Sequence, residues 1–318
     1  MAVYTHLSAE TLDKLIAAYD VGKLVSAKGI AEGISNSNWL IETTGKGVSG
    51  SRFILTMYEY RIDTAQLPFF LNLLDHLAAK GCPVPATVHD REGNAYRDLD
   101  GKAVALIEFL PGVSIDHPAP EQAFAVGSAL AQVHLASADF PMERQNDLRP
   151  EDWNHLLNQC GADGLASISS DLVDAVSAHL PNLMSDWPSG LPIGTIHADL
   201  FPDNVLMLDD KVSGLIDFYF ACTDITAYDV AVAHTAWCFS PDGSQFNAEI
   251  SSSLMAGYLS VRALSDAEIT ALPLLAKGAA MRFIATRSFD WLNTTADALV
   301  MRKDPMDYVR RLQHYQAM

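Results

Sequence analysis

Three polar residues in one short segment have the types and spacing that phosphoryl transfer requires. They are His197, Asp199 and Asn204, and a further carboxylate, Asp217, follows eighteen residues after Asp199. One carboxylate of such a set can orient or deprotonate an attacking hydroxyl group, while an amide oxygen and a second carboxylate can hold Mg²⁺ against nucleotide phosphates. We therefore predict that Asp199, Asn204 and Asp217 are catalytic, and that Asn204 and Asp217 are also the metal ligands.

A short hairpin is expected to position these groups. Val205–Leu208 and Val212–Asp217 have the composition of strands, and the acidic turn Asp209-Asp210 joins them. The hairpin would bring Asn204 and Asp217 to the same end. A structural hairpin that merely carries polar turn residues is the alternative, but phosphoryl transfer accounts for more of the pattern.

The wider chain predicts an α+β fold that divides at Pro111-Gly112. Before this break, helices are expected near 8–20 and 67–80, and the main strands at Leu24–Ala31, Trp39–Thr43, Arg52–Tyr58 and Val104–Leu110. After it, helices are expected at 121–136, 151–160, 168–180, 226–238, 246–260, 266–292 and 305–316. The prediction is thus a small β-rich, nucleotide-binding N-lobe at 1–110. A larger helical lobe, catalytic and substrate-binding, follows at 111–318.

Composition excludes several classes of partner. The 318 residues carry 21 Lys and Arg against 39 Asp and Glu, a formal net charge of −18. Such a surface repels phosphate backbones and anionic lipid, so we expect no nucleic-acid partner and no membrane partner. The sequence begins without a secretory signal, and its four cysteines contain no C-x-x-C pair. A cytoplasmic protein is therefore expected, and the oligomeric state is left open.

The motif residues resemble the protein-kinase-like superfamily, in the small-molecule branch with aminoglycoside phosphotransferases and choline kinases. Ala198 stands where regulated protein kinases have the arginine of His-Arg-Asp, and no Ala-Pro-Glu segment follows Asp217. The resemblance implies a two-lobed kinase-like fold. It also implies that Asp229, in Tyr228-Asp229-Val230-Ala231, braces the catalytic loop together with His197.

Within that branch the chain resembles the kinase-fold type of bacterial homoserine kinase over about residues 3–316. The segments that carry this resemblance are Gly29–Asn38, Ile54–Glu59, Leu67–Phe70, His197–Val205, Ile216–Cys222, Ala236–Phe239 and Arg282–Leu292. The resemblance implies transfer of the ATP γ-phosphoryl group to the side-chain hydroxyl of L-homoserine, a step toward threonine. It implies ATP and Mg²⁺ as cofactors and L-homoserine as the small-molecule partner.

One departure from the superfamily pattern concerns the phosphates. Thr56 occupies the third-strand position of the usual phosphate-binding lysine, and Phe70 falls near its glutamate partner. The absence of both the lysine and its glutamate partner makes physical sense, because a buried charge without its partner is costly. Arg52 or Arg61 could replace the cation, although each is more simply a solvated surface arginine.

Backbone N–H groups of the turn-rich segment Gly33–Asn38 are the other candidate for binding the phosphates. The predicted nucleotide-binding residues are accordingly Gly33, Ser35, Asn36 and Ser37, together with Glu108 and Leu110 before the break, whose backbone would bind adenine.

A zwitterionic acceptor needs a cation for its carboxylate and an acceptor for its ammonium group. The predicted substrate residues are Asp199, Asp224, Trp237, Arg282, Arg287 and Asp290. Arg287 and Asp290 could instead pair with each other on a solvated helix, and Trp237 could be ordinary core.

Two alternatives to homoserine phosphorylation stay open. One is another small-molecule kinase of the same fold, acting on an aminoglycoside, choline or methylthioribose. The other is a nucleotide-binding pseudokinase, which the missing lysine–glutamate pair suggests and the intact Asp199, Asn204 and Asp217 oppose.

Overall fold

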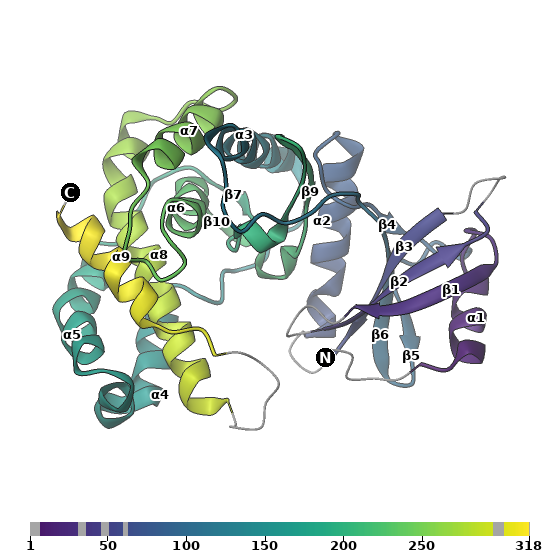
Figure 1. Cartoon of the computed structure of the whole chain (residues 1–318), viewed down its shortest axis with the longest axis horizontal. Coiled ribbons are helices and arrows are strands. Elements are labelled where there is room, and N and C mark those ends of the chain that lie inside the picture. The colour runs from purple at the N-terminus through teal and green to yellow at the C-terminus, as the bar shows by residue number, and fades with distance from the viewer. Residues whose placement is uncertain (1–6, 31–35, 46–50, 60–62, 295–301, 318) are drawn as a thin grey trace. The chain divides into compact units, whose positions relative to one another are not determined.

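A computed structural model of the chain describes residues 7–30, 36–45, 51–59, 63–294 and 302–317 (Figure 1). The chain divides into two compact units, Met1–Pro111 and Gly112–Met318. The first is built on an antiparallel sheet and the second is mainly helical, which confirms the predicted α+β class.

The first unit contains six strands and two helices among its described residues. The sheet order is β1-β2-β3-β6-β4, with β5 also paired to β6. The strands are β1 (Leu24–Ile30), β2 (Asn36–Thr43), β3 (Ser51–Tyr58), β4 (Thr87–Val88), β5 (Arg97–Leu99) and β6 (Lys102–Glu108). The helices are α1 (Ala9–Ala17) and α2 (Leu67–Ala79), and a 3₁₀ turn, Thr64–Gln66, precedes α2.

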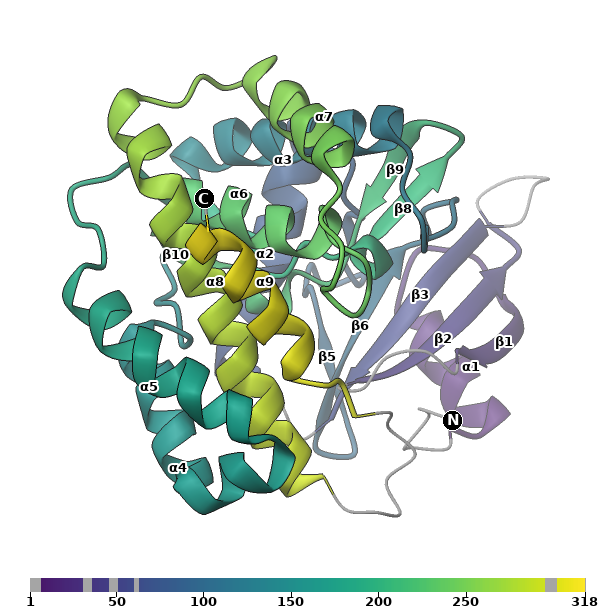
Figure 2. The same ribbon diagram turned by 60° about the vertical axis from the view of Figure 1, so that its left-hand side comes forward.

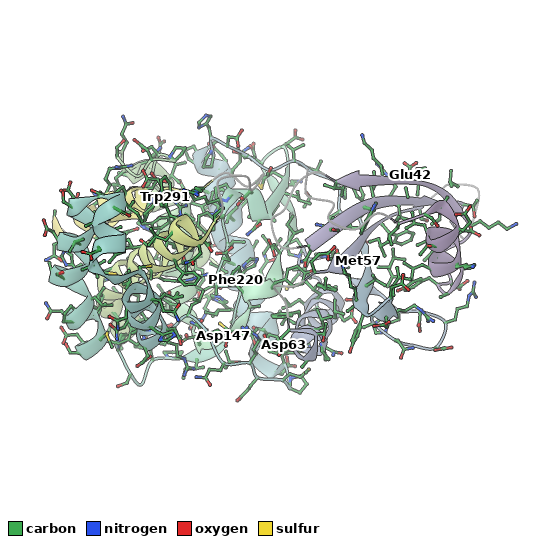
Figure 3. The ribbon with its side chains drawn as sticks, turned by 90° about the horizontal axis from the view of Figure 1, so that it is seen from below. Glu42, Met57, Asp63, Asp147, Phe220 and Trp291 are labelled. Atoms are coloured by element: carbon green, nitrogen blue, oxygen red, sulfur yellow. The ribbon has the colours of Figure 1, made fainter. Side chains whose placement is uncertain are left out.

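Helix α1 covers one face of this sheet with its apolar side (Figure 1). Its Leu12, Leu15 and Ile16 join a core with alternate residues of the three central strands. Those strand residues are Trp39, Ile41, Leu55, Met57, Val104 and Leu106, of which Met57 is labelled in Figure 3. Because successive strand side chains point to opposite faces, Asn38 and Thr56 belong to the face that α1 does not cover.

Strand β2 begins earlier than predicted, and this corrects the expected turn. Asn36, Ser37 and Asn38 pair with Tyr58, Met57 and Thr56 of β3 instead of forming a loop. Their small polar side chains suggested a turn, but cross-strand pairing with β3 outweighs that local preference. Of the segment predicted to bind phosphate, Gly33 and Ser35 lie outside the described residues.

The second unit contains seven helices among its described residues, all at the predicted places. They are α3 (Pro120–Ala136), α4 (Pro150–Ile168), α5 (Ser170–Ser185), α6 (Thr226–Trp237), α7 (Ala248–Leu259), α8 (Asp266–Asn293) and α9 (Met306–Ala317). Helix α4 runs eight residues beyond its expected end, across a kink at Gly161, where φ is 67°.

Two small antiparallel sheets carry the segments of chemical interest. β7 (Ile193–Ile196) pairs with β10 (Cys222–Ile225), and β8 (Val205–Leu208) pairs with β9 (Lys211–Leu215). The β8–β9 pair is the expected hairpin, and β9 ends two residues before Asp217. Short 3₁₀ turns at Pro202–Asn204 and Phe218–Phe220 flank the two sides of this hairpin.

Helix α8 is the central helix of the second unit and packs against α4, α6 and α9 (Figure 2). By length and composition it could cross a membrane, but 56% of its most apolar stretch is buried inside this unit. The core packing accounts for its apolar character. It also places the charged residue Arg282 among buried neighbours, at 2% exposure.

Candidate active site

The carboxylate of one aspartate on α6 holds the beginning of the segment from His197 to Asn204 by hydrogen bonds. Asp229 of α6 accepts hydrogen bonds from the backbone N–H groups of His197 and Ala198, each at 2.7 Å. Its Oδ2 also lies 3.0 Å from Nε2 of His134 on α3. Burial would raise the pKa of Asp229, but the hydrogen bonds from His134 and the loop hold that pKa below its ordinary value. This carboxylate therefore braces the loop as an anion.

The backbone of Ala198 is held by Asp229 in a strained conformation. Its φ of 62° places a residue with a Cβ in the left-handed region, which costs about 1–2 kcal/mol. The two amide hydrogen bonds from His197 and Ala198 to Asp229 offset this cost. The strained turn carries the backbone directly into Asp199.

His197 is fixed in one tautomer by its two contacts. Nε2 lies 3.0 Å from the carbonyl oxygen of Ile216, so Nε2 carries the proton. Nδ1 then accepts the backbone N–H of Asp199, at 3.2 Å. Burial lowers the pKa of His197 and favours this neutral form. Both ring nitrogens are thus used in joining the loop to the strand before Asp217.

The structure brings the three predicted catalytic residues to one place. The Asn204 amide nitrogen donates to the carbonyl of Asp199 at 2.8 Å, which leaves its amide oxygen for another partner. Asp217 adopts a left-handed conformation, with φ 64° and ψ 54°, and the adjacent Phe218 ring packs on His197 at 4.4 Å between centroids. The 3₁₀ turn Pro202–Asn204 therefore positions Asn204, and the β8–β9 hairpin positions Asp217.

Asp199 and Asp217 affect each other electrostatically. Burial, reinforced by the charges of Asp199 and Asp203, raises the pKa of Asp217 to about 7. Burial also raises the pKa of Asp199, and the charge of Arg282 opposes that rise. Neighbouring desolvated carboxylates are costly as anions unless cations lie between or beside them. The site is therefore suited to bind a cation.

Arg282 of α8 supplies one positive charge to this loop. Its guanidinium group donates to the carbonyl of Ala198 and lies 3.3 Å from Oδ1 of Asp199. It also lies over the rings of Phe220, labelled in Figure 3, and Phe283. Arg282 was predicted to bind substrate, and the structure shows it holding the loop that carries Asp199.

The other predicted substrate residues are spread over the second unit. Arg287 donates to the carbonyl of Asp304 and to Oδ2 of Asp307, at 2.9 and 2.8 Å. Asp290 is exposed, and its eight-residue separation from Arg282 corresponds to about 12 Å along the helix. Arg287 is thus held by the segment that leads into α9.

Asp224 and Trp237 also have protein partners. The carboxylate of Asp224 accepts the amide N–H of Asn146 and the backbone N–H of Ile225, both at 2.7 Å. Trp237 is 2% exposed, and its indole N–H donates to the carbonyl of Leu200 at 2.9 Å. This contact favours a core residue that supports the loop over a wall of the substrate site.

In the first unit, the predicted phosphate-binding strand residues point to different faces. Ser37 donates to Glu59, which also binds Lys102, on the face covered by α1. Asn36 shares the opposite face with Asn38 and Thr56, and its buried amide oxygen has no hydrogen-bond partner among the described residues. Of Ser37 and Asn36, it is therefore Asn36 that has a side-chain polar atom without a hydrogen-bond partner among the described residues.

Thr56 is bound to a residue that was not among the predicted site residues. Its hydroxyl group donates to the amide oxygen of Asn38 at 2.9 Å, across the directly paired positions of β2 and β3. Asn38 was missed because it was taken as part of a turn. The alternation Asn36, Asn38 before the apolar residues of β2 was the available signal.

The remaining predicted contacts lie near the end of β6. Glu108 uses its N–H and its carboxylate on the backbone of Ala86, while Leu110 is half-buried after the strand. Arg52 lies 4.7 Å from the ring of Phe109 at the opposite end of β3 from Tyr58. Arg61 lies outside the described residues, and Phe70 is buried in α2 as an apolar core residue.

Sequence comparison assigns the class. The sequence matches the phosphotransferase enzyme family over residues 26–264, and the chain belongs to this family. A homoserine kinase from Xanthobacter autotrophicus is 50% identical over 318 residues, covering 100% of this chain and 97% of the relative. A homoserine kinase from Gluconobacter oxydans is 49% identical and covers 100% and 99%.

Solved structures show the same fold at low sequence identity. The amicoumacin kinase hAmiN, in complex with AMP-PNP, Ca²⁺ and Ami, superimposes with a TM-score of 0.69 at 17% identity, covering 98% of this chain and 94% of the other. A microcompartment-associated aminopropanol kinase gives 0.68 at 19% identity, with coverage of 98% and 96%. The kinase-like fold predicted from the sequence is confirmed.

Proposed function

We propose that this protein transfers the γ-phosphoryl group of ATP to the side-chain hydroxyl of L-homoserine, giving O-phospho-L-homoserine and ADP. The observation that carries this proposal is the near 50% identity to homoserine kinases over the whole chain. The geometry of Asp199, Asn204 and Asp217 supports it, because phosphoryl transfer needs this set of groups in one place.

In this reaction Asp199 orients the acceptor hydroxyl and takes its proton. The hydroxyl oxygen forms a bond to the γ-phosphorus, and the bond from that phosphorus to the ADP oxygen breaks. A pKa of Asp199 above the ordinary value suits a general base at neutral pH. Arg282 keeps the carboxylate from rotating away and partly compensates its charge.

Asn204 and Asp217 are proposed to hold Mg²⁺ through the free amide oxygen and the carboxylate. No group of three or more His, Cys, Asp or Glu side chains among the described residues could bind a metal. Two oxygen ligands nevertheless fit Mg²⁺, which commonly keeps waters and phosphate oxygens as its other ligands. When bound, this ion would neutralise charge on the nucleotide phosphates.

ATP is the proposed phosphoryl donor, and the first unit is proposed to bind it. Backbone groups of Glu108 and Leu110 are assigned to adenine. The phosphates are assigned to the segment from Gly33 through Ser35 to Asn36, whereas Ser37, whose side chain is bound to Glu59 on the face covered by α1, is not assigned to them. The side-chain amide of Asn36 supports its place there through its N–H groups, which can donate to phosphate oxygens.

A panel of acceptors tests the proposal. Purified protein with Mg-ATP is given L-homoserine, L-serine, L-threonine, choline, methylthioribose or an aminoglycoside, and ADP release is measured with product identification by mass spectrometry. Phosphorylation of homoserine with kcat/KM at least a hundredfold above the other acceptors is expected. Preferential use of another acceptor would assign a different small-molecule kinase, and nucleotide binding without any turnover would indicate a pseudokinase.

The proposed location is the cytoplasm, where this biosynthetic substrate would be made and used. All four cysteines are free thiols in the structure, as a reducing compartment requires.

A further inference from the structure

The acceptor carboxylate requires a positive charge close to the reacting hydroxyl group. In homoserine only four covalent bonds separate the hydroxyl oxygen from the carboxyl carbon, so this charge must lie in the neighbourhood of Asp199. Arg282 is there, but it is 2% exposed and its guanidinium group is bound to Ala198 and Asp199. Arg287 is bound to Asp304 and Asp307 near the start of α9.

Lys303 is a cation near the same loop with its charge available. Its ammonium nitrogen lies 5.6 Å from the ring centroid of Phe201. Phe201 follows Asp199 by two residues, and its N–H donates to the carbonyl of Asp199 at 2.9 Å. The Phe201 ring is in turn fixed by edge contact with Phe283 of α8, with 5.1 Å between centroids. The lysine thus lies over a rigid part of the loop.

No hydrogen bond or ion pair to the described part of the chain engages the Lys303 ammonium group, and the residue is exposed. Its neighbour Arg302 differs, because that guanidinium donates to the carbonyl of Thr294 and lies over the Trp291 ring. The charge of Lys303 also partly opposes the burial-driven rise in the pKa of both Asp199 and Asp217, which places it within electrostatic reach of these two carboxylates.

We propose that Lys303 binds the carboxylate of the amino-acid acceptor and so selects an amino acid over a simple amino alcohol. This inference rests on the proposed function. A lysine suits the task because its ammonium is a point charge on a flexible stem, free to close on the substrate after binding. The contact to Phe201 would hold the stem near the loop before substrate arrives.

The test compares Lys303→Met with the wild type and with Arg302→Met as the matched control. Initial rates give KM for L-homoserine and KM for ATP in each protein. The Ki of 3-aminopropan-1-ol, which is homoserine without its carboxylate, is measured against homoserine. In Lys303→Met, a rise of at least tenfold in KM for homoserine is expected, with KM for ATP and this Ki within twofold of wild type. Lys303→Arg should recover part of the loss, and Arg302→Met should leave all three constants within twofold.

The outcomes separate this inference from the proposed function. Wild-type activity on the acceptor panel decides the function alone. If homoserine is the substrate but Lys303→Met leaves its KM unchanged, the assignment of Lys303 is wrong. Equal weakening of ATP, homoserine and 3-aminopropan-1-ol would overturn it as well, because a phosphate-binding lysine or a distorted loop would then explain the result.

Discussion

The guanidinium group of Arg282 lies 3.3 Å from Oδ1 of Asp199 and also donates to the carbonyl of Ala198. One side chain of α8 therefore holds both the strained residue of the loop and the proposed base that follows it. Because all of these groups are largely shielded from water, this contact is stronger than a surface ion pair would be.

Replacing Arg282 with methionine should lower kcat by about tenfold to a hundredfold. The carboxylate of Asp199 would lose its fixed orientation, while ATP binding would be spared. We expect KM for homoserine and ATP to change less than threefold, and Arg282→Lys to recover part of kcat. Steady-state kinetics on the folded variants, checked by circular dichroism, decides this. A selective rise in KM for homoserine would instead support the sequence-based prediction that this arginine binds the substrate carboxylate.

Asp199→Asn should remove most turnover and leave nucleotide affinity nearly intact. The amide can still accept a hydrogen bond from the hydroxyl group but cannot take its proton. We expect kcat to fall at least 100-fold, within the range that general-base catalysis contributes. Calorimetric titration with AMP-PNP and Mg²⁺ should give a Kd within threefold of wild type. Near-normal turnover would show that another group is the base.

Asp217→Ala should weaken binding of the magnesium nucleotide itself. This variant loses a proposed direct ligand of the ion, so Kd for Mg-AMP-PNP should rise at least tenfold. Nucleotide titrations with and without Mg²⁺ provide the measurement. The magnesium-dependent part of the affinity should disappear, whereas binding of metal-free nucleotide should change little. A magnesium dependence equal to wild type would remove Asp217 from the proposed ligand set.

Thr56→Ala should have little effect on ATP affinity. Its hydroxyl group is already donated to Asn38, so we expect KM for ATP to rise less than threefold. Arg52→Ala is the matched test of a displaced cation. Arg52 lies four residues along β3 from Thr56, about 13 Å, and rests over Phe109, so we expect a similarly small effect. A tenfold loss in Arg52→Ala would mean that this arginine replaces the missing lysine.

His234 should make the protein less stable as the pH is lowered from 6.5 toward 4, whereas Asp217, whose pKa is raised to about 7, acts in the opposite direction. Burial, together with the charge of His314, lowers the pKa of His234 from its ordinary 6.5 to about 4. Between these values His234 is protonated more in the unfolded chain than in the folded chain, so its contribution to the free energy of unfolding falls as the pH falls. Urea unfolding across this range measures the slope.

The matched variant is His234→Gln, whose amide can still bond to Tyr315 and Ser251, the present partners of His234. The slope of its free energy of unfolding against pH should be less positive than that of wild type. Other groups set the remaining pH dependence, because burial also lowers the pKa of His197 and His179 and raises that of Asp217. An unchanged slope would show that His234 does not contribute to the pH dependence.

Periodicity in the sequence was sufficient to place the helices of the second unit. Helix α8 illustrates why, since its apolar run extends between a Ser265 cap and the end of the run near Asn293. The β8–β9 hairpin was likewise predictable, because strand composition and an acidic turn agreed. These local signals were also sufficient to predict that Asn204 and Asp217 lie at the same end of the hairpin, without information on tertiary packing.

The direction of individual side chains was not predictable in the same way. Arg282 and Arg287 both lie on α8, but they have different partners. Arg282 contacts Asp199 of the catalytic loop, whereas Arg287 contacts Asp307 of α9. Their partners depend on how α9 and the catalytic loop pack around α8, which spacing along α8 does not report. Asn36 and Asn38 were misplaced for a related reason, because β3 draws them into the sheet.

Asp229 joins parts of the second unit that are far apart in the chain. Its carboxylate contacts His134, and Nδ1 of His134 lies 2.8 Å from the hydroxyl oxygen of Tyr258 on α7. The same carboxylate also accepts the backbone N–H groups of His197 and Ala198. The left-handed turn at Ala198 is therefore held by a carboxylate whose own position depends on the packing of α3, α6 and α7. We expect the reactive geometry to form late in folding, so that enzyme refolding from denaturant regains catalysis in step with tertiary packing, after its helices have formed.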